Sequence, residues 1–197
     1  MGKEGRYLSI DLETTGLDPE WCSVLEVGIV IADWDSPMDD LPTFRCFLSS
    51  DDSRGRDDST RTEYFYGTPY ALWLNAEIFK YLALQPKDEA EALKMGFDEY
   101  VPIYQPCEVG FEICEFLREN GFDLRDHLTA AGKNFGAFDL QFLRRLELGN
   151  DKVIFRHRAI DPAMYYWRPD TDGNRLPGMK QCMERGYPGR GATHGCR

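Results

Sequence analysis

The first part of the chain contains three short apolar stretches of strand length. Residues 7–10 are mostly apolar or aromatic, and the chain reaches Thr-Thr-Gly at 14–16, which is typical of a short buried strand that runs into a loop. Residues 24–33 and 43–48 are two further apolar stretches. Because only turn-rich gaps separate the three stretches, they predict an antiparallel meander.

After these strands, helical and extended patterns alternate. Apolar residues at helical spacing predict helices over residues 68–83, 109–120, 137–148, 163–167 and 176–185. Strands are expected at 128–134 and 153–160. Residues 49–106 interrupt the alternation and predict an insert or cleft wall, which begins with a Ser-, Asp- and Arg-rich surface loop. The order of elements predicts an α/β fold with a mixed central sheet, antiparallel in its first three strands and flanked by helices.

The composition is that of a folded globular protein. With 197 residues, 42% hydrophobic and 13% aromatic, the chain is long enough for one domain with a substantial core. No apolar run is long enough to span a membrane, and the first residues do not resemble a signal peptide. The six cysteines form no Cys-x-x-Cys pair, so we expect reduced thiols in an intracellular, cytoplasmic protein.

The formal net charge of −11 argues against a general nucleic-acid coat protein, which would be basic. It does not argue against an enzyme that holds a few nucleotides. A site built from carboxylates and metal ions is itself acidic, and a local basic patch is enough to hold phosphates.

Two carboxylates interrupt the first predicted strand. Asp11 and Glu13 are two residues apart, so their side chains lie on the same face of that strand. Neighbouring carboxylates that lose hydration repel each other unless a cation lies between them, and Mg²⁺ and Mn²⁺ prefer such oxygen ligands. The alternative is a pair of solvated surface charges, but the apolar strand and the tight turn favour a metal site. Glu26, in the second strand, is either a buried partner of this chemistry or a feature of strand register.

Two later residues fit the same chemistry. Asp139 falls in the first turn of the predicted helix 137–148, where the helix dipole tolerates an acid, and His194 lies near the end of the sequence. A set of Asp and Glu oxygens suits two-metal cleavage of phosphodiesters. A histidine nearby is able to accept the proton of the attacking water, because its pKa lies close to neutral.

Two motifs are more specific than these single residues. Residues 10–17 read Ile-Asp-Leu-Glu-Thr-Thr-Gly-Leu, and residues 132–143 read Gly-Lys-Asn-Phe-Gly-Ala-Phe-Asp-Leu-Gln-Phe-Leu. They resemble the opening strand and the Asn…Phe-Asp helix start of the DEDDh 3′→5′ exonucleases, which have the ribonuclease H-like fold. This family includes the proofreading exonuclease subunit of bacterial DNA polymerase III and oligoribonuclease. Lys133 stands where many members have His.

The end of the chain resembles the family's third motif in part. Residues 158–162 and 176–180 are similar to the segments that precede it, and His194 fits its histidine. The matching aspartate would fall at position 199. The sequence given therefore carries three of the four carboxylates that the family uses, and we expect its C-terminal helix to be truncated.

The resemblance implies a metal-dependent exonuclease that removes nucleoside monophosphates from the 3′ ends of single-stranded RNA or DNA. It implies two Mg²⁺ or Mn²⁺ ions, no membrane partner, and an oligomeric state that is open and includes a homodimer. The implied roles are metal ligands at Asp11 (bridging both ions), Glu13 and Asp139, a general base at His194, and contacts to the terminal nucleotide at Thr14, Gly16, Leu17 and Asn134.

Four aromatic residues, Phe65, Tyr66, Tyr70 and Trp73, are candidates for one wall of a substrate cleft, because single strands bind by stacking on aromatic rings. The alternative is that these rings belong to the core.

Two other functions stay open: a catalytically impaired relative that binds nucleic acid or a protein, and another metal hydrolase such as a phosphatase. Residues 10–17 argue against the phosphatase, because contacts to a terminal nucleotide have no purpose there.

Overall fold

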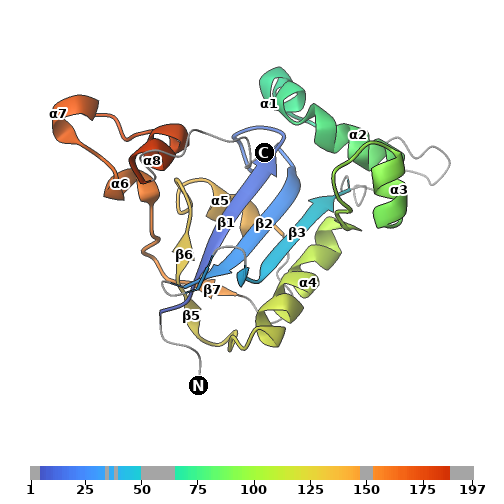
Figure 1. Cartoon of the computed structure of the whole chain (residues 1–197), viewed down its shortest axis with the longest axis horizontal. Helices are drawn as coiled ribbons and strands as arrows, with labels where there is room; N and C mark the ends of the chain where they lie inside the picture. Colours follow the sequence, from blue (N-terminus) through green and yellow to red (C-terminus); the bar gives the residue numbers. More distant parts are fainter. Residues whose placement is uncertain (1–4, 34–35, 38–39, 50–64, 147–152, 187–197) are drawn as a thin grey trace.

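The computed structural model describes residues 5–33, 36–37, 40–49, 65–146 and 153–186. Its central sheet has the strand order β4-β3-β2-β1-β6. Figure 1 labels β3, β2, β1 and β6 of this sheet. The strands are β1 (Tyr7–Thr14), β2 (Val24–Ala32), β3 (Thr43–Leu48), β4 (Ile103–Tyr104) and β6 (Ala130–Ala131). β1, β2 and β3 pair antiparallel, whereas β4 and β6 join the two sides of this meander in parallel. The mixed α/β sheet predicted from the sequence is confirmed.

The later strands are shorter than the sequence pattern predicts. The stretch expected at 128–134 is divided into β5 (His127–Leu128) and β6, and that at 153–160 contains β7 (Ile154–Phe155) and a single bridge at Ile160. β5 pairs with β7 in a separate two-stranded sheet, while β6 pairs with β1. The extended chain therefore changes partners at Thr129, whose carbonyl accepts a hydrogen bond from the Leu8 N–H at 2.9 Å.

Eight helices are described. They are α1 (Pro69–Leu74), α2 (Ala76–Leu84), α3 (Glu89–Lys94), α4 (Pro106–Glu119), α5 (Asp139–Leu143), α6 (Pro162–Tyr165), α7 (Pro169–Asp172) and α8 (Met179–Gly186). The helix predicted at 109–120 is confirmed as α4. It begins earlier, at Pro106, because Gln105 and Glu108 form a capping box around that proline.

Two helix predictions need correction, and two short elements were not predicted. The helix expected over 68–83 is two helices, because Asn75 leaves helical geometry between α1 and α2. The helix expected over 137–148 has its described helical part in Asp139–Leu143 only, and residues 147–152 lie outside the described residues. In the insert, α3 and β4 had no counterpart in the sequence prediction, because both are too short for a periodic pattern.

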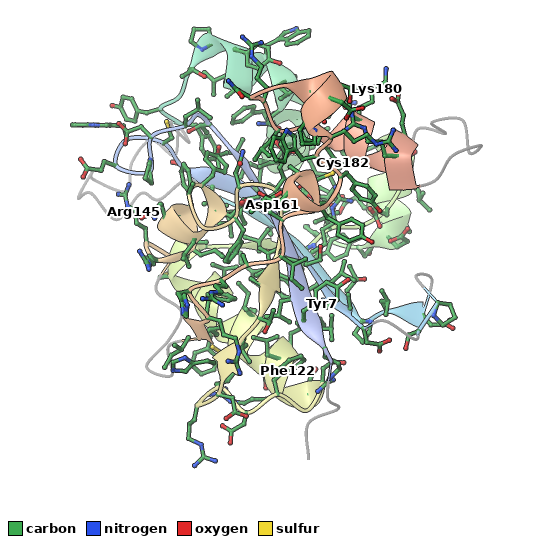
Figure 2. All side chains as sticks on the ribbon, turned by 90° about the vertical axis from the view of Figure 1, so that its left-hand side faces the viewer. Tyr7, Phe122, Arg145, Asp161, Lys180 and Cys182 are labelled. Carbon is green, nitrogen blue, oxygen red and sulfur yellow. The ribbon has the colours of Figure 1, made fainter. Side chains whose placement is uncertain are left out.

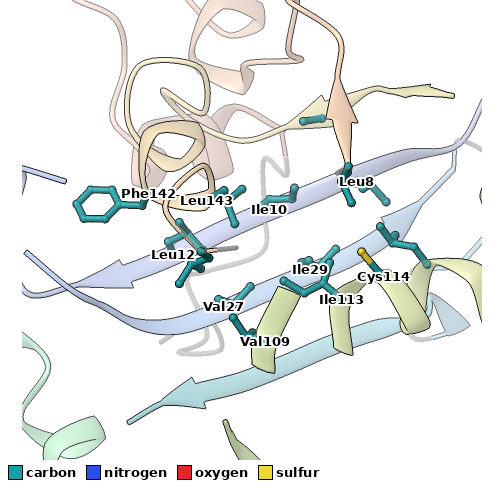
Figure 3. Close-up of a cluster of buried hydrophobic side chains, with 14 of the residues drawn as sticks. Leu8, Ile10, Leu12, Val27, Ile29, Val109, Ile113, Cys114, Phe142 and Leu143 are labelled. Atoms are coloured by element: carbon teal, nitrogen blue, oxygen red, sulfur yellow. The ribbon is translucent and has the colours of Figure 1, made fainter. Parts of the chain in front are cut away.

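The main core lies on one face of the sheet, between β1–β3 and the helices α4 and α5 (Figure 3). Leu8, Ile10 and Leu12 of β1 all point into it, as alternate residues of a strand do. The opposite face carries a smaller cluster formed by Leu25 and Phe47 with α2 and Val101. Since no residue of β1 belongs to this second cluster, the second face of β1 is left for polar side chains.

Among the described residues, no helix is both long and apolar enough to cross a membrane. The five described cysteines are all free thiols; they are Cys22, Cys46, Cys107, Cys114 and Cys182. Near the end of the described chain, Arg185 of α8 makes a bidentate ion pair with Asp172 at 2.6 Å and donates to the Tyr166 carbonyl. These contacts fix α6, α7 and α8 to one another.

The packing of α4 predicts a large cost for one substitution. Leu117 is completely buried in the main core, so Leu117→Ala is expected to lower the free energy of unfolding by about 2–5 kcal/mol. Phe111 on the same helix is 65% exposed, and Phe111→Ala is expected to change stability by less than about 0.5 kcal/mol. Urea unfolding of both variants measures the difference. Equal losses would contradict the described orientation of α4.

Candidate active site

Asp11 and Glu13 lie on the face of β1 that is turned away from the main core. Asp11 pairs across the sheet with Gly28, which has no side chain, and Glu13 pairs with Glu26. Asp11 is therefore exposed and Glu13 is half-buried, whereas the intervening Leu12 is in the core. The pairing register shifts directly after Glu13, where the strand enters the Thr-Thr-Gly turn.

Asp139 reaches the same end of β1 from another part of the chain. It is the first residue of α5 and is only 3% exposed. β6 pairs with β1 only at Leu8 and Ser9, so farther along, the edge of β1 is left without that partner. There the backbone N–H of Leu12 donates a hydrogen bond to the Asp139 carboxylate. The short β6 thus leaves space for a carboxylate at the strand edge.

The loop between β6 and α5 is held close to β1. A Cβ added at Gly132 would lie 2.7 Å from the Ile10 carbonyl oxygen, so only glycine fits at this approach. Asn134 has a positive φ of 60°, and its N–H donates to Asp161 Oδ2 at 3.1 Å. Asp161 Oδ1 also accepts from the Ala163 N–H at the start of α6. Figure 2 labels the position of Asp161. Asp161 therefore links the loop that carries Asp139 to α6.

The three carboxylates influence one another electrostatically. Burial, followed by the nearby charge of Asp11, raises the pKa of Asp139 to about 7, with a smaller contribution from Glu13. Burial also raises the pKa of Glu13, and the charges of Asp11 and Glu26 raise it further. Partial loss of hydration against the sheet raises the pKa of Asp11 as well, although its side chain remains open to solvent. All three groups thus resist ionisation, which is the situation that a bound cation relieves.

These carboxylates fit a metal ion in their donor chemistry but not in their described arrangement. Three carboxylates at one edge of a sheet have the donor chemistry that Mg²⁺ and Mn²⁺ prefer. Within the part of the chain that the structure describes, however, no group of three or more His, Cys, Asp or Glu side chains is arranged so that it could hold an ion. The donors are thus brought into one region, and closing around an ion requires further movement of their side chains.

Asn75 is a site residue that the sequence analysis missed. It is only 6% exposed, and its side-chain amide donates to the Thr14 carbonyl at 3.1 Å. The same side chain hydrogen-bonds to Glu13 and lowers its pKa, against the larger effect of burial. The break between α1 and α2 delivers this amide to the end of β1. An Asn inside an apolar helical pattern was the available signal.

The turn after β1 is bound to the start of α1. Thr15 Oγ1 donates to the Tyr66 carbonyl at 2.5 Å, and the Thr68 N–H donates to the Thr15 carbonyl at 2.8 Å. Thr14 is buried and donates from Oγ1 to the Gly16 carbonyl at 2.7 Å, so its hydroxyl stabilises the turn itself. Leu17, just after this turn, is 80% exposed. Among the residues assigned to the terminal nucleotide, Leu17 presents the largest free apolar surface.

The remaining candidates differ in position. Asn134 is exposed in the loop before α5, and His194 lies outside the described residues. Glu26 forms an ion pair with Arg45 at 2.5 Å, and Arg45 also binds Glu99. Glu26 therefore has both of the roles considered for it. It pairs with Glu13 across the strands and its charge raises the pKa of Glu13, while Arg45 holds the Glu26 carboxylate.

Most of the candidate aromatic residues are not core residues. Tyr66, Tyr70 and Trp73 are each at least 70% exposed, so the core interpretation is wrong for these three. Phe65 is different, because it packs against the smaller core cluster and against Phe79. The tertiary structure thus separates one core ring from three surface rings.

No family model matches the chain, and no curated protein matches it in sequence. Solved structures of exonuclease I match it in fold. A structure of an ExoI/SSB-Ct complex is 12% identical, with a TM-score of 0.50, over 93% of this chain and 36% of that chain. A structure of E. coli exonuclease I with a 5cy-dT13 oligonucleotide is 12% identical, with a TM-score of 0.49, over 86% of this chain and 31% of that chain.

This chain therefore spans about a third of the length of the exonuclease I structures that it matches. The likeness in fold agrees with the five-stranded mixed sheet and its flanking helices. The ribonuclease H-like architecture expected from the sequence is confirmed.

The buried amide of Asn75 predicts a measurable loss of stability. In Asn75→Ala, the buried Thr14 carbonyl loses its donor, and the free energy of unfolding is expected to fall by about 1–3 kcal/mol. Asn75→Asp is a matched variant of nearly equal size that adds a negative charge beside Glu13. Urea unfolding at pH 5 and pH 8 is expected to show a larger loss for Asn75→Asp at pH 8. An Asn75→Ala variant as stable as the unmodified protein would contradict the described role.

The raised pKa of Asp139 predicts how the free energy of unfolding of the metal-free protein depends on pH. The folded protein binds a proton at Asp139 up to about pH 7, whereas the unfolded chain releases it near its ordinary pKa of 3.8. Stability that is present at low pH is therefore lost as the pH rises from about 4 to about 7. Asp139→Asn removes this contribution and is expected to be more stable at pH 8 by on the order of 2–4 kcal/mol.

Urea unfolding of Asp139→Asn and of the unmodified protein between pH 4 and 8, in EDTA, tests this. Asp126→Asn, at an exposed position, is the control and keeps the dependence of the unmodified protein. The slope in Asp139→Asn is expected to be shallower, and the part that remains comes from Asp11 and Glu13, whose pKa values are also raised. An unchanged slope would mean that Asp139 is not the group that titrates.

Proposed function

We propose that this chain is a metal-dependent 3′→5′ exonuclease domain that releases nucleoside monophosphates from single-stranded RNA or DNA. The observation that carries this proposal is the approach of Asp139 to β1, where burial and the charges of Asp11 and Glu13 raise its pKa and the pKa of each of these two acids is raised as well. Three carboxylates that resist ionisation at a partly open sheet edge are costly for a purely structural site. They are useful where cations and a phosphodiester bind together.

Asp11, Glu13 and Asp139 would hold the ions. When bound, Mg²⁺ or Mn²⁺ would neutralise charge on the phosphate and promote ionisation of the attacking water. Asn75 would orient the Glu13 carboxylate through its buried amide. The Leu12 N–H would hold the Asp139 carboxylate toward β1 in the same way.

Other residues of this chain would bind the strand and move the proton. Leu17 would pack against the terminal base, and the backbone of Thr14 and Gly16 would contact its sugar. Asn134, exposed in the loop before α5, would bind the same nucleotide. His194 would accept the proton of the attacking water, since an imidazole titrates close to neutral pH.

The fold supports the proposal at a coarser level. The structure of an ExoI/SSB-Ct complex has the same fold. The sequence motif at 10–17 supports the same chemistry, because both carboxylates and the turn that we expect to contact the nucleotide lie on one strand and its loop.

The test uses 5′-labelled single-stranded RNA and DNA of equal sequence, incubated with Mg²⁺, with Mn²⁺ or with EDTA. A ladder that shortens from the 3′ end is expected with metal and not with EDTA. Glu13→Gln and Asp139→Asn are expected to lose about a hundredfold or more in rate, because the loss of a ligand removes several kcal/mol of charge stabilisation. His194→Ala is expected to lose about 10²–10⁴-fold.

Asp126→Asn is the matched carboxylate control, because Asp126 is exposed and lies on the loop before β5, away from these groups in the sequence. It is expected to keep the full rate. Cleavage that persists in EDTA would overturn the metal-dependent mechanism. Binding of a strand with no cleavage in any metal would instead indicate the binding module, and cleavage restricted to small phosphoesters would indicate the phosphatase.

A further inference from the structure

The start of α1 carries an exposed aromatic surface, defined here as Tyr66, Tyr70 and Trp73. Their side chains are 71%, 70% and 72% exposed. Tyr70 and Trp73 are three residues apart on α1, and their ring centroids are 6.3 Å apart. Burying such rings in water-free contacts is strongly favourable, so three exposed rings in one short segment indicate a binding surface.

This surface is continuous with the candidate active site. The Tyr66 carbonyl and the Thr68 N–H both bind Thr15 in the turn after β1. A Cβ added at Gly67 would lie 2.2 Å from the Thr15 carbonyl oxygen, so the two backbones touch. At its other end, α1 stops at Asn75, which hydrogen-bonds to Thr14 and Glu13. Both ends of the aromatic segment are thus fixed to the strand that carries the carboxylates.

The aromatic surface is also uncharged. Residues 65–76 contain no Asp, Glu, Lys or Arg, in a chain with 34 acidic and 23 basic residues. Within this segment itself, a polyanion meets neither an acidic side chain that would repel its phosphates nor a basic side chain that would bind them; acids follow at Glu77 of α2 and at the carboxylates of β1. An occupant with negatively charged phosphates would therefore be held through its bases, by stacking.

We propose that Tyr66, Tyr70 and Trp73 form a stacking platform for unpaired bases of the single strand whose 3′ end lies at the carboxylates. The proposal rests on the proposed function, because the occupant is the exonuclease substrate upstream of its terminal nucleotide. Stacking on rings accepts any base, which suits an enzyme that shortens a strand step by step. A base-paired strand cannot use the platform, because its bases are already stacked and paired within the duplex.

The experiment measures binding apart from cleavage. A 5′-fluorescein-labelled dT12 is titrated with the protein in EDTA and followed by fluorescence anisotropy. Trp73→Ala and Tyr70→Ala are each expected to raise the Kd by about tenfold, the loss of roughly one stacked base. Trp73→Phe keeps a ring and is expected to restore most of the affinity. Phe111→Ala removes an equally exposed ring from α4 and is expected to bind like the unmodified protein.

Two further measurements identify the chemistry. The ratio of Kd values between Trp73→Ala and the unmodified protein is expected to be the same at 50 and 300 mM NaCl, because no charge is involved; a ratio that shrinks with salt would overturn stacking. A dT12 with abasic units at every position except its two 3′-terminal nucleotides is expected to bind the unmodified protein and Trp73→Ala equally. A tenfold difference on this abasic strand would overturn recognition through bases.

Hydrolysis of dT12 by the unmodified protein with Mn²⁺ is measured separately and tests the proposed function alone. If the strand is hydrolysed but Trp73→Ala and Tyr70→Ala bind it as tightly as the unmodified protein, the platform is wrong and the exonuclease stands. If the strand is not hydrolysed but these two variants bind it tenfold more weakly, the platform stands and the exonuclease is wrong. Failure of the unmodified protein to bind dT12 overturns the platform and leaves the surface to a protein partner.

Discussion

The alternation of side chains along β1 is the constraint on which both the core and the candidate site depend. Leu8, Ile10 and Leu12 must face the helices α4 and α5 to form the main core. Asp11 and Glu13 are thereby placed on the other face, next to Gly28 and Glu26 of β2. A shift of one residue in the pairing of β1 would bury two carboxylates and expose the leucines, so the energy of the core also fixes the position of the site.

The same packing makes the site electrostatically unfavourable. Covering one face of β1 and placing α5 at its edge removes water from Asp139, and the neighbouring acids raise its pKa further. Two neutral groups, the Asn75 amide and the Leu12 N–H, offset part of this cost without adding a positive charge. The donors described for these acids are thus neutral, and under the proposed function a bound cation would supply the positive charge.

The insert between β3 and α4 contributes more to the site than a covering for the sheet. Its helix α2 packs on the second face through Ile78, Tyr81 and Leu82, which anchors the segment. Its helix α1 is then held against the turn after β1 by backbone hydrogen bonds, so its rings stay in the solvent. A rigid anchor on one side and exposed rings on the other are what a binding wall requires.

The sequence by itself determined the elements whose signals are local. β1, β2 and β3 follow from apolar runs of strand length, α4 from its periodicity, and the place of Asp139 in a first helical turn from the residues around it. The pairing of Asp11 with Glu13 on one face follows from the period of a strand alone.

Only the tertiary structure decided which distant residues meet. β6 ends after two paired residues, and Gly132 lets the next loop approach Ile10, so that Asp139 reaches β1. Neither feature produces a repeating apolar pattern in the sequence from which it could be predicted. Asn75 breaks a continuous apolar pattern because its buried amide satisfies Thr14, a contact 61 positions away. Phe65 and Trp73 are aromatic residues of the same uncharged segment, yet Phe65 is packed and Trp73 is exposed, because burial depends on which surface the folded chain brings opposite each ring.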